Sequence, residues 1–228
     1  MIKNNFAKLK KEIYEHAIIN DKNPFDIKIL AVTKTFPIEI ILKAIEAGIE
    51  YLGESRVQES IEKIPSLYGK YKEFHFIGHL QTNKINKILT LKPTLIHSID
   101  KYSTAFELNN CLKNLNRTQD ILVEVNTSGE SSKLGVSPQE CADLIKKIND
   151  LEFIRIKGLM TIGANSTDEN IVKKCFGTLR ELFEKEKNNL HDNVQMKYLS
   201  MGMSGDYKIA IETGSNLLRI GSAIFGGR

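Results

Sequence analysis

The chain has 228 residues, of which 41% are hydrophobic and 26% are charged. These ordinary globular values exclude a disordered chain and a membrane-embedded one. The formal net charge is +4, and the 32 basic and 28 acidic residues are spread along the sequence. A nucleic-acid-binding protein usually carries a concentrated basic stripe, so we do not expect a nucleic-acid ligand. The mild excess of lysine suits a small anionic ligand instead.

The N-terminal residues and the cysteines indicate the compartment. Residues Met1 to Phe6 contain no apolar stretch with a cleavage site, so we expect no signal peptide and a cytoplasmic location. The cysteines Cys111, Cys141 and Cys175 are odd in number and widely spaced. This pattern favours buried reduced thiols over disulfides or a metal site, and we expect no bound metal.

Helical and strand-like segments alternate along the chain. Residues 2 to about 20 predict a helix with one apolar stripe, formed by Ile2, Phe6, Leu9, Ile13 and Ala17. Eight apolar runs follow, and each predicts a buried strand. They lie near Lys28 to Thr33, Glu50 to Gly53, Phe74 to Gly78, Thr94 to Ser98, Ile121 to Asn126, Ile154 to Met160, Lys197 to Met201 and Leu217 to Phe225.

Amphipathic segments between these runs predict the connecting helices. One begins after Pro37 and ends near Gly48, a suitable C-terminal cap. Residues Ser137 to Glu140 predict a capping box with Pro138 at the first helical position. A third apolar stripe runs from Val172 to Phe183.

Strands that alternate with single helices pair in parallel through right-handed crossovers. Eight of them predict an α/β fold, a single (β/α)8 TIM barrel over residues 1–228 with an extra N-terminal helix. An open doubly wound sheet is the alternative, but no glycine-rich dinucleotide fingerprint follows the first strand. The last predicted strand ends at Phe225, so we expect no second domain.

Lys34 stands at the carboxyl end of the first predicted strand. Parallel α/β folds keep their chemistry at these ends. A lysine can simply follow a strand in solvent, but an amine on a rigid, partly desolvated strand end can also attack an aldehyde. Lys34 is therefore the candidate for a Schiff base.

A candidate phosphate site lies near the end of the chain. The small residues between Leu199 and Asp206, and again between Leu218 and Ser222, predict backbone N–H groups and hydroxyls at loop and helix starts. These residues can equally form tight turns. Arg219 is more specific, because a guanidinium within an apolar strand needs a partner.

The segment Phe74 to Lys84 is the densest in polar and aromatic side chains. His75 alternates with two phenylalanines and fits a satisfied core histidine, whereas His79, Gln81 and Asn83 follow the strand and could line a ligand site. The two histidines are four residues apart, which is metal-ligand spacing on a helix. Gly78 and the strand pattern argue against that interpretation.

Seven motifs in chain order resemble the pyridoxal phosphate homeostasis protein family, a group of fold type III barrels similar to the alanine racemase N-terminal domain. The motifs are ILAVTKTFP (29–37), LGESRVQE (52–59), FHFIGHLQTNK (74–84), VNTSGESSKLG (125–135), GLMTIGA (158–164), LSMGMSGD (199–206) and RIGSAIFG (219–226).

This resemblance implies that Lys34 holds pyridoxal 5′-phosphate (PLP) as an aldimine and that Arg219 faces the pyridine ring. The positions implied for the phosphate are Ser200, Ser204, Gly221 and Ser222. The positions implied for the rest of the pocket are Asn126, His79 and Met201. Two departures are present: Ser55 replaces the asparagine of the family's GEN motif, and Phe36 replaces a second lysine after Lys34. Lys133 remains as the other basic loop position.

The resemblance further implies a buffer or carrier of PLP that exchanges the cofactor reversibly, with recipient PLP enzymes as partners and no efficient catalysis of its own. We expect a monomer that binds neither nucleic acid nor membranes. Two alternatives stay open: a PLP-dependent amino-acid racemase or other slow PLP enzyme, and an aldolase-like barrel that uses Lys34 on a phosphorylated sugar.

Overall fold

The protein is described by a computed structural model that covers residues 1–189 and 192–227. Eight parallel strands form a closed barrel in which each strand pairs with its neighbours in sequence and β1 pairs with β8. The strands are β1 (Lys28–Val32), β2 (Tyr51–Glu54), β3 (Glu73–Phe76), β4 (Leu95–Ile99), β5 (Gln119–Glu124), β6 (Ile154–Met160), β7 (Val194–Ser200) and β8 (Leu217–Ile220). The predicted barrel is confirmed.

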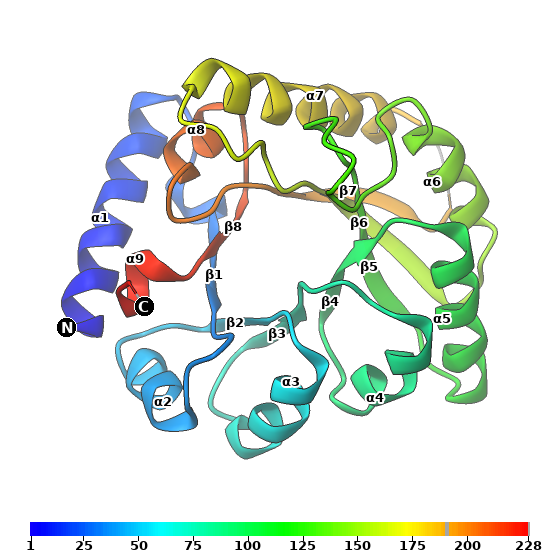
Figure 1. The fold of residues 1–228 in the computed structure, drawn as a ribbon, viewed down its shortest axis with the longest axis horizontal. Coiled ribbons are helices and arrows are strands. Elements are labelled where there is room, and N and C mark those ends of the chain that lie inside the picture. The colour runs from blue at the N-terminus through cyan, green and yellow to red at the C-terminus, as the bar shows by residue number, and fades with distance from the viewer. Residues whose placement is uncertain (190–191, 228) are drawn as a thin grey trace.

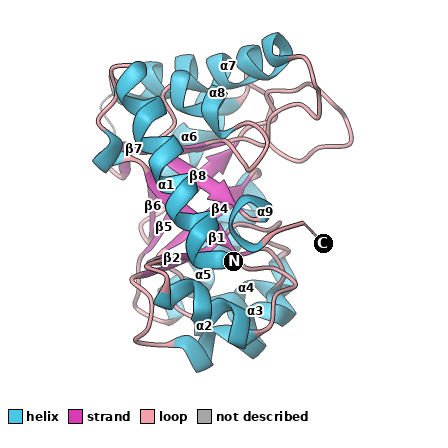
Figure 2. Ribbon diagram, turned by 90° about the vertical axis from the view of Figure 1, so that its left-hand side faces the viewer, coloured by secondary structure: helices cyan, strands magenta, loops and turns pink. Residues whose placement is uncertain are grey.

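The helices surround the ring of strands (Figures 1 and 2). They are α1 (Ile2–Ile19), α2 (Ile38–Glu46), α3 (Val57–Lys63), α4 (Ile85–Thr90), α5 (Tyr102–Asn114), α6 (Cys141–Asn149), α7 (Glu169–Lys187), α8 (Tyr207–Glu212) and α9 (Ser222–Phe225). Short 3-10 turns occur at η1 (Pro24–Asp26), η2 (Ile64–Leu67) and η3 (Thr82–Lys84). Within the described residues, no helix has the length and apolarity that a membrane crossing requires.

Apolar residues lie on both faces of the strands, because the strands are covered by helices outside and by one another inside. The larger apolar cluster fills the space between strands and helices. A smaller one lies inside the barrel and consists of Leu30, Leu95, Leu122, Met160 and Leu217. The predicted free cysteines are confirmed, and all three are buried in the outer layer of helices.

Helix α1 packs beside α8, α9 and α2 and covers the outside of the β8–β1 junction (Figure 1). Four of the five residues of its predicted stripe are buried: Phe6, Leu9, Ile13 and Ala17. Two polar contacts fix the helix, since Asn5 Nδ2 donates to the carbonyl of Ile224 at 3.1 Å and the Tyr207 hydroxyl donates to Glu12 Oε2 at 2.6 Å.

The substitution Tyr207→Phe tests this docking. We expect it to lower the free energy of unfolding by about 1 kcal/mol, because it removes a hydrogen bond to a carboxylate and keeps the buried ring. Urea unfolding followed by circular dichroism measures the change. The matched control is Tyr14→Phe on α1, where the side chain is half exposed. Equal effects from both substitutions would contradict a specific role for the Tyr207 hydroxyl.

Two predicted boundaries were wrong. Strand β8 ends at Ile220, and residues 222–225 form α9, because apolar residues after Gly221 fit a buried helix as well as a strand. Helix α6 begins at Cys141 rather than at Pro138. Ser137 closes a separate turn by accepting the Glu140 N–H on its carbonyl oxygen, at 3.1 Å, and on its hydroxyl, at 3.3 Å. The predicted cap at Gly48 is confirmed by its φ of +96° after α2.

Candidate functional site

Lys34 lies just beyond β1, at the carboxyl-terminal mouth of the barrel. Its side chain is half-buried between the fully buried Thr33 and the exposed Thr35. Among the described residues, Lys34 Nζ has no hydrogen-bond or ion-pair partner. The amine is therefore held on a rigid support and is free to react.

A cavity of about 410 Å³ opens beside Lys34, within the size range of small-molecule sites. It lies among the segments that follow β1, β7 and β8. Its lining consists of Val32, Lys34, Phe36, Met203, Ser204, Gly205, Arg219, Gly221, Ser222 and Gly226. These described residues supply two cations and no carboxylate, so the cavity suits an anionic ligand.

Hydrogen-bond donors gather at one end of the cavity. Ser204 Oγ accepts the N–H of Gly221 at 3.3 Å and the N–H of Ala223 at 3.1 Å. Ser222 is exposed and lines the cavity next to them. Phosphate oxygens in proteins accept hydrogen bonds from main-chain N–H groups and serine hydroxyls. The hydroxyls of Ser204 and Ser222 fit the phosphate of PLP, as do the two N–H groups once they exchange Ser204 Oγ for a phosphate oxygen, and the amine of Lys34 fits the aldehyde.

Phe36 lines another side of the cavity, and Phe225, which lies outside the lining, packs against it. The Phe36 and Phe225 rings stack with centroids 4.4 Å apart and an interplanar angle of 26°. The stack ties the segment after Lys34 to α9, and aromatic pairs of this geometry add to the stability that burial supplies.

Arg219 is 5% exposed and is held rigidly at the cavity. Its Nη1 donates to Ser200 Oγ at 2.8 Å and its Nη2 to the carbonyl of Thr161 at 2.7 Å. Burial lowers the pKa of Arg219 to about 10, against the opposing charges of Glu124 and Asp206. The guanidinium is therefore still charged at neutral pH.

A chain of hydrogen bonds continues from Arg219 through the barrel interior. Ser200 Oγ lies 3.2 Å from His97 Nδ1, His97 Nε2 lies 2.9 Å from His75 Nδ1, and His75 Nε2 lies 2.9 Å from Glu73 Oε2. Lys28 Nζ donates to Glu73 Oε1 at 2.6 Å, at the amino-terminal end of the barrel.

The donor and acceptor capacities of these groups fix the direction in which each hydrogen bond of the series is donated. The Glu73 carboxylate can only accept, so His75 Nε2–H donates to it, and Nδ1 of the neutral His75 ring accepts from His97 Nε2–H. Nδ1 of the neutral His97 ring then accepts the Ser200 hydroxyl hydrogen, while Ser200 Oγ accepts from Arg219. Both histidines are neutral at pH 7, because burial lowers their pKa values. Glu73 opposes this effect at His75, whereas His75 and Arg219 lower the pKa of His97 further. The orientation of Arg219 is thus fixed by an ordered chain that ends on a carboxylate.

Glu124 is another titratable group near Arg219 with a shifted pKa. Its side chain is 4% exposed. Burial and the neighbouring Asp100 raise the pKa of Glu124 to about 7, although the charge of Arg219 opposes this rise. A substantial fraction of Glu124 is therefore protonated at neutral pH.

Comparison with known proteins agrees with this geometry. Residues 2–228 match the model of the family described as alanine racemase, N-terminal domain. The chain is 39% identical over 230 residues to the pyridoxal phosphate homeostasis protein of Pasteurella multocida, covering 100% of this chain and 97% of the relative. It is 40% identical over 201 residues to the Aquifex aeolicus protein of the same name, covering 88% and 87%. This chain belongs to the pyridoxal phosphate homeostasis protein family.

A solved structure extends the comparison. PipY from Synechococcus elongatus, determined with PLP bound, matches with a TM-score of 0.85 and 26% sequence identity. The match covers 99% of this chain and 100% of PipY.

The structure brings five of the nine positions implied by the family resemblance to the same cavity: Lys34, Ser204, Arg219, Gly221 and Ser222. Ser200 and Met201 are fully buried and lie outside the cavity lining. Ser200 instead supports Arg219 from within the barrel.

The two remaining family positions lie on other loops. His79 is exposed after β3, and Asn126 follows β5. The Asn126 amide donates to the carbonyls of Glu130 and Lys133 at 2.9 and 3.2 Å, so it organises its own loop. Neither residue lines the cavity.

The structure also shows where the two residues that depart from the family motifs lie. Phe36 lines the cavity, and Ser55 follows β2 with its carbonyl against Gly78. A Cβ at Gly78 would lie 1.9 Å from this oxygen, which explains the glycine in FHFIGHLQTNK. Lys133 Nζ is engaged with Glu130 Oε1 at 2.7 Å and with the carbonyl of Gly163 at 2.8 Å.

Sequence reasoning missed His97, Thr161 and Glu124. They lie on or directly after three different strands, and only the closed barrel brings them toward Arg219. The available signal for His97 was the alternation within Leu95–Ile99, which directs it to the same side as the inward-facing Leu95.

Proposed function

We propose that this chain binds PLP as a Schiff base on Lys34 and buffers or carries the cofactor without efficient catalysis of its own. The cavity beside Lys34 is the observation that carries the proposal, because it combines the amine of Lys34, the guanidinium of Arg219 and a cluster of N–H and hydroxyl groups. The names of the curated relatives and PipY with PLP bound support the same ligand.

Each residue then has a distinct role. Lys34 Nζ would bond to the aldehyde carbon, and Ser204 and Ser222 would hold the phosphate through their hydroxyls. The Gly221 N–H would join them by exchanging Ser204 Oγ for a phosphate oxygen. Phe36 limits access of water from one side. The cofactor supplies a reactive aldehyde and an aromatic ring that can accept electrons.

Arg219 supports a holding role over a catalytic one. A guanidinium near the pyridine nitrogen disfavours its protonation and so weakens the ring as an electron sink. Because the hydrogen-bond chain from Ser200 to Glu73 fixes Arg219 in place, this effect is built into the barrel.

The cellular setting is part of the proposal. We place the protein in the cytoplasm, because three buried free cysteines suit a reducing compartment. We further propose that residues 1–228 act as one domain and as a monomer, with PLP enzymes as recipients.

The substitution Lys34→Ala tests the anchor. Wild-type protein mixed with PLP is expected to show an imine absorption band, and Lys34→Ala is expected to show none. Borohydride reduction and peptide mass mapping should place the adduct on Lys34. The control Lys43→Ala, an exposed lysine on α2, should behave as wild type. An adduct scattered over surface lysines, or an unchanged band in Lys34→Ala, would refute the proposal.

A second experiment separates a carrier from an enzyme. Purified PLP-loaded protein should reactivate a PLP-free recipient enzyme faster than an equal amount of free cofactor. Alanine and serine should keep their chirality during long incubation with the same protein. Rapid racemisation would favour the racemase alternative.

A further inference from the structure

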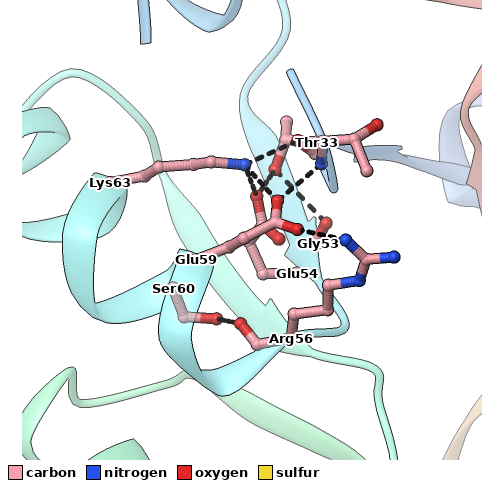
Figure 3. A network of polar contacts seen from close by, with 8 residues as sticks. Thr33, Gly53, Glu54, Arg56, Glu59, Ser60 and Lys63 are labelled. Atoms are coloured by element: carbon pink, nitrogen blue, oxygen red, sulfur yellow. Dashed lines mark hydrogen bonds and ion pairs between the residues drawn. The ribbon is translucent and has the colours of Figure 1, made fainter. Parts of the chain in front are cut away.

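Three side chains on β2 and α3 form a partly buried cluster against the backbone on either side of Lys34. Figure 3 shows Lys63 reaching from α3 toward Glu54, Glu59 and the main chain at Thr33. We call Glu54, Glu59 and Lys63 the clamp. Their side chains are 0%, 18% and 11% exposed, respectively, and none of them lines the cavity.

The clamp binds the backbone on both sides of Lys34. Glu59 Oε2 accepts the Thr35 N–H at 2.6 Å, and Lys63 Nζ donates to the Thr33 carbonyl at 3.2 Å. These two groups belong to the peptide units that flank Lys34. The clamp therefore determines the direction in which the Lys34 side chain leaves the barrel.

Ion pairs tie the clamp together. Lys63 Nζ lies 2.6 Å from Glu59 Oε2 and 3.2 Å from Glu54 Oε1. Glu54 Oε1 also accepts the Thr33 hydroxyl at 2.7 Å, and Arg56 Nη1 donates to Glu59 Oε1 at 2.9 Å. Hydrogen bonds to ionised groups in a partly buried setting are strong and directional.

The backbone beside Lys34 needs this support. Thr35 has a φ of +69°, a left-handed conformation that a β-branched residue rarely adopts. Such a conformation persists only when surrounding contacts hold it, and strained residues concentrate at functional sites. Glu59 supplies the contact to the N–H of this strained residue.

We propose that Glu54, Glu59 and Lys63 are positioning residues, which hold the Thr33–Thr35 backbone so that Lys34 Nζ enters the cavity ready to form an imine. This inference rests on the proposed function. In the reaction, the neutral Lys34 amine adds its lone pair to the aldehyde carbon. A carbon–nitrogen double bond forms, and the carbonyl oxygen leaves as water with the two amine hydrogens. The clamp touches none of these atoms and acts only through the backbone.

The substitution Glu59→Ala is the main test, with Lys63→Met as the second variant. In protein without ligand, hydrogen exchange of the Thr35 amide should become at least about tenfold faster. The apparent PLP affinity read from the imine band should weaken by about tenfold or more, because small displacements of a reacting group have large effects. Binding of pyridoxine 5′-phosphate, which has an alcohol in place of the aldehyde, should stay within about twofold of wild type.

Two further variants separate positioning from general stability. Glu59→Gln keeps an oxygen that can accept the Thr35 N–H, so it should restore most of the imine affinity. Glu62→Ala removes an exposed glutamate from the same helix and should match wild type in all three measurements.

The outcomes are distinguishable. Wild-type exchange at Thr35 and wild-type imine affinity in Glu59→Ala would overturn the positioning role alone. Equal weakening of PLP and pyridoxine 5′-phosphate would also overturn it, because the clamp would then act on the whole site. A wild-type protein that forms no band at Lys34 would instead refute the proposed function.

Discussion

Replacing Gly158 with alanine is expected to lower the free energy of unfolding by about 4 kcal/mol or more. Gly158 lies within β6 and has a φ of +146°, a conformation that residues with a side chain rarely adopt. An added Cβ would lie 1.9 Å from the carbonyl oxygen of Tyr198 on β7. Neither group can retreat, because both belong to adjacent strands of a closed barrel.

This effect follows from the register of the two strands. The pairing of β6 with β7 shifts between Ile156 and Gly158, and the irregularity brings the two backbones together at the glycine. Urea unfolding followed by circular dichroism measures the loss of stability. Reduced soluble expression of Gly158→Ala points in the same direction.

Gly177→Ala provides the matched control. Gly177 lies inside α7, and a Cβ there would meet no heavy atom within 4 Å. Alanine should raise the free energy of unfolding by about 0.5–1 kcal/mol, because it restricts the unfolded chain and favours the helix. A Gly158→Ala protein as stable as wild type would show that β6 and β7 can separate locally.

The barrel could be predicted from the sequence because each strand carries a local signal. The segment Ile154–Met160 was predicted with the observed bounds, since it is apolar and a helical stripe begins soon after it. The end of the chain could not be assigned in the same way. Ala223, Ile224 and Phe225 are apolar in either conformation, and only packing against α1 selects the helix α9.

The sequence could predict those site residues that stand at the carboxyl ends of strands. Lys34 and Arg219 meet because the carboxyl ends of adjacent parallel strands share one mouth. The sequence does not indicate how deep in the barrel a side chain lies. Ser200 lies below the cavity, where it contacts Arg219 and His97. Loop residues such as His79 have no periodicity that fixes their direction, so the sequence could not place them relative to Lys34.

The largest pH-dependent effect is expected from Glu124→Gln, measured without ligand. The folded-state pKa of Glu124 is raised from 4.5 to about 7 by burial and by Asp100. Folding therefore favours the protonated carboxyl. The stability associated with this proton is fully present below pH 4.5 and is lost as the pH rises toward 7. Wild-type protein should lose about 3 kcal/mol from this group between pH 4.5 and pH 8.

Glutamine has nearly the shape of a protonated glutamate and does not titrate. The stability of Glu124→Gln relative to wild type should thus rise by about 3 kcal/mol from pH 4.5 to pH 8, as measured by urea unfolding at each pH. The control Gln139→Ala, which changes an exposed residue that does not titrate, should give a difference that is constant with pH. Arg219 stays charged across this range, since its pKa is about 10. A constant difference for Glu124→Gln as well would mean that folding does not raise the pKa of Glu124 and that its carboxylate is ionised at neutral pH. Arg219 would then neutralise Glu124 as a buried ion pair, and its positive charge would no longer be free to act on the ring of a bound cofactor.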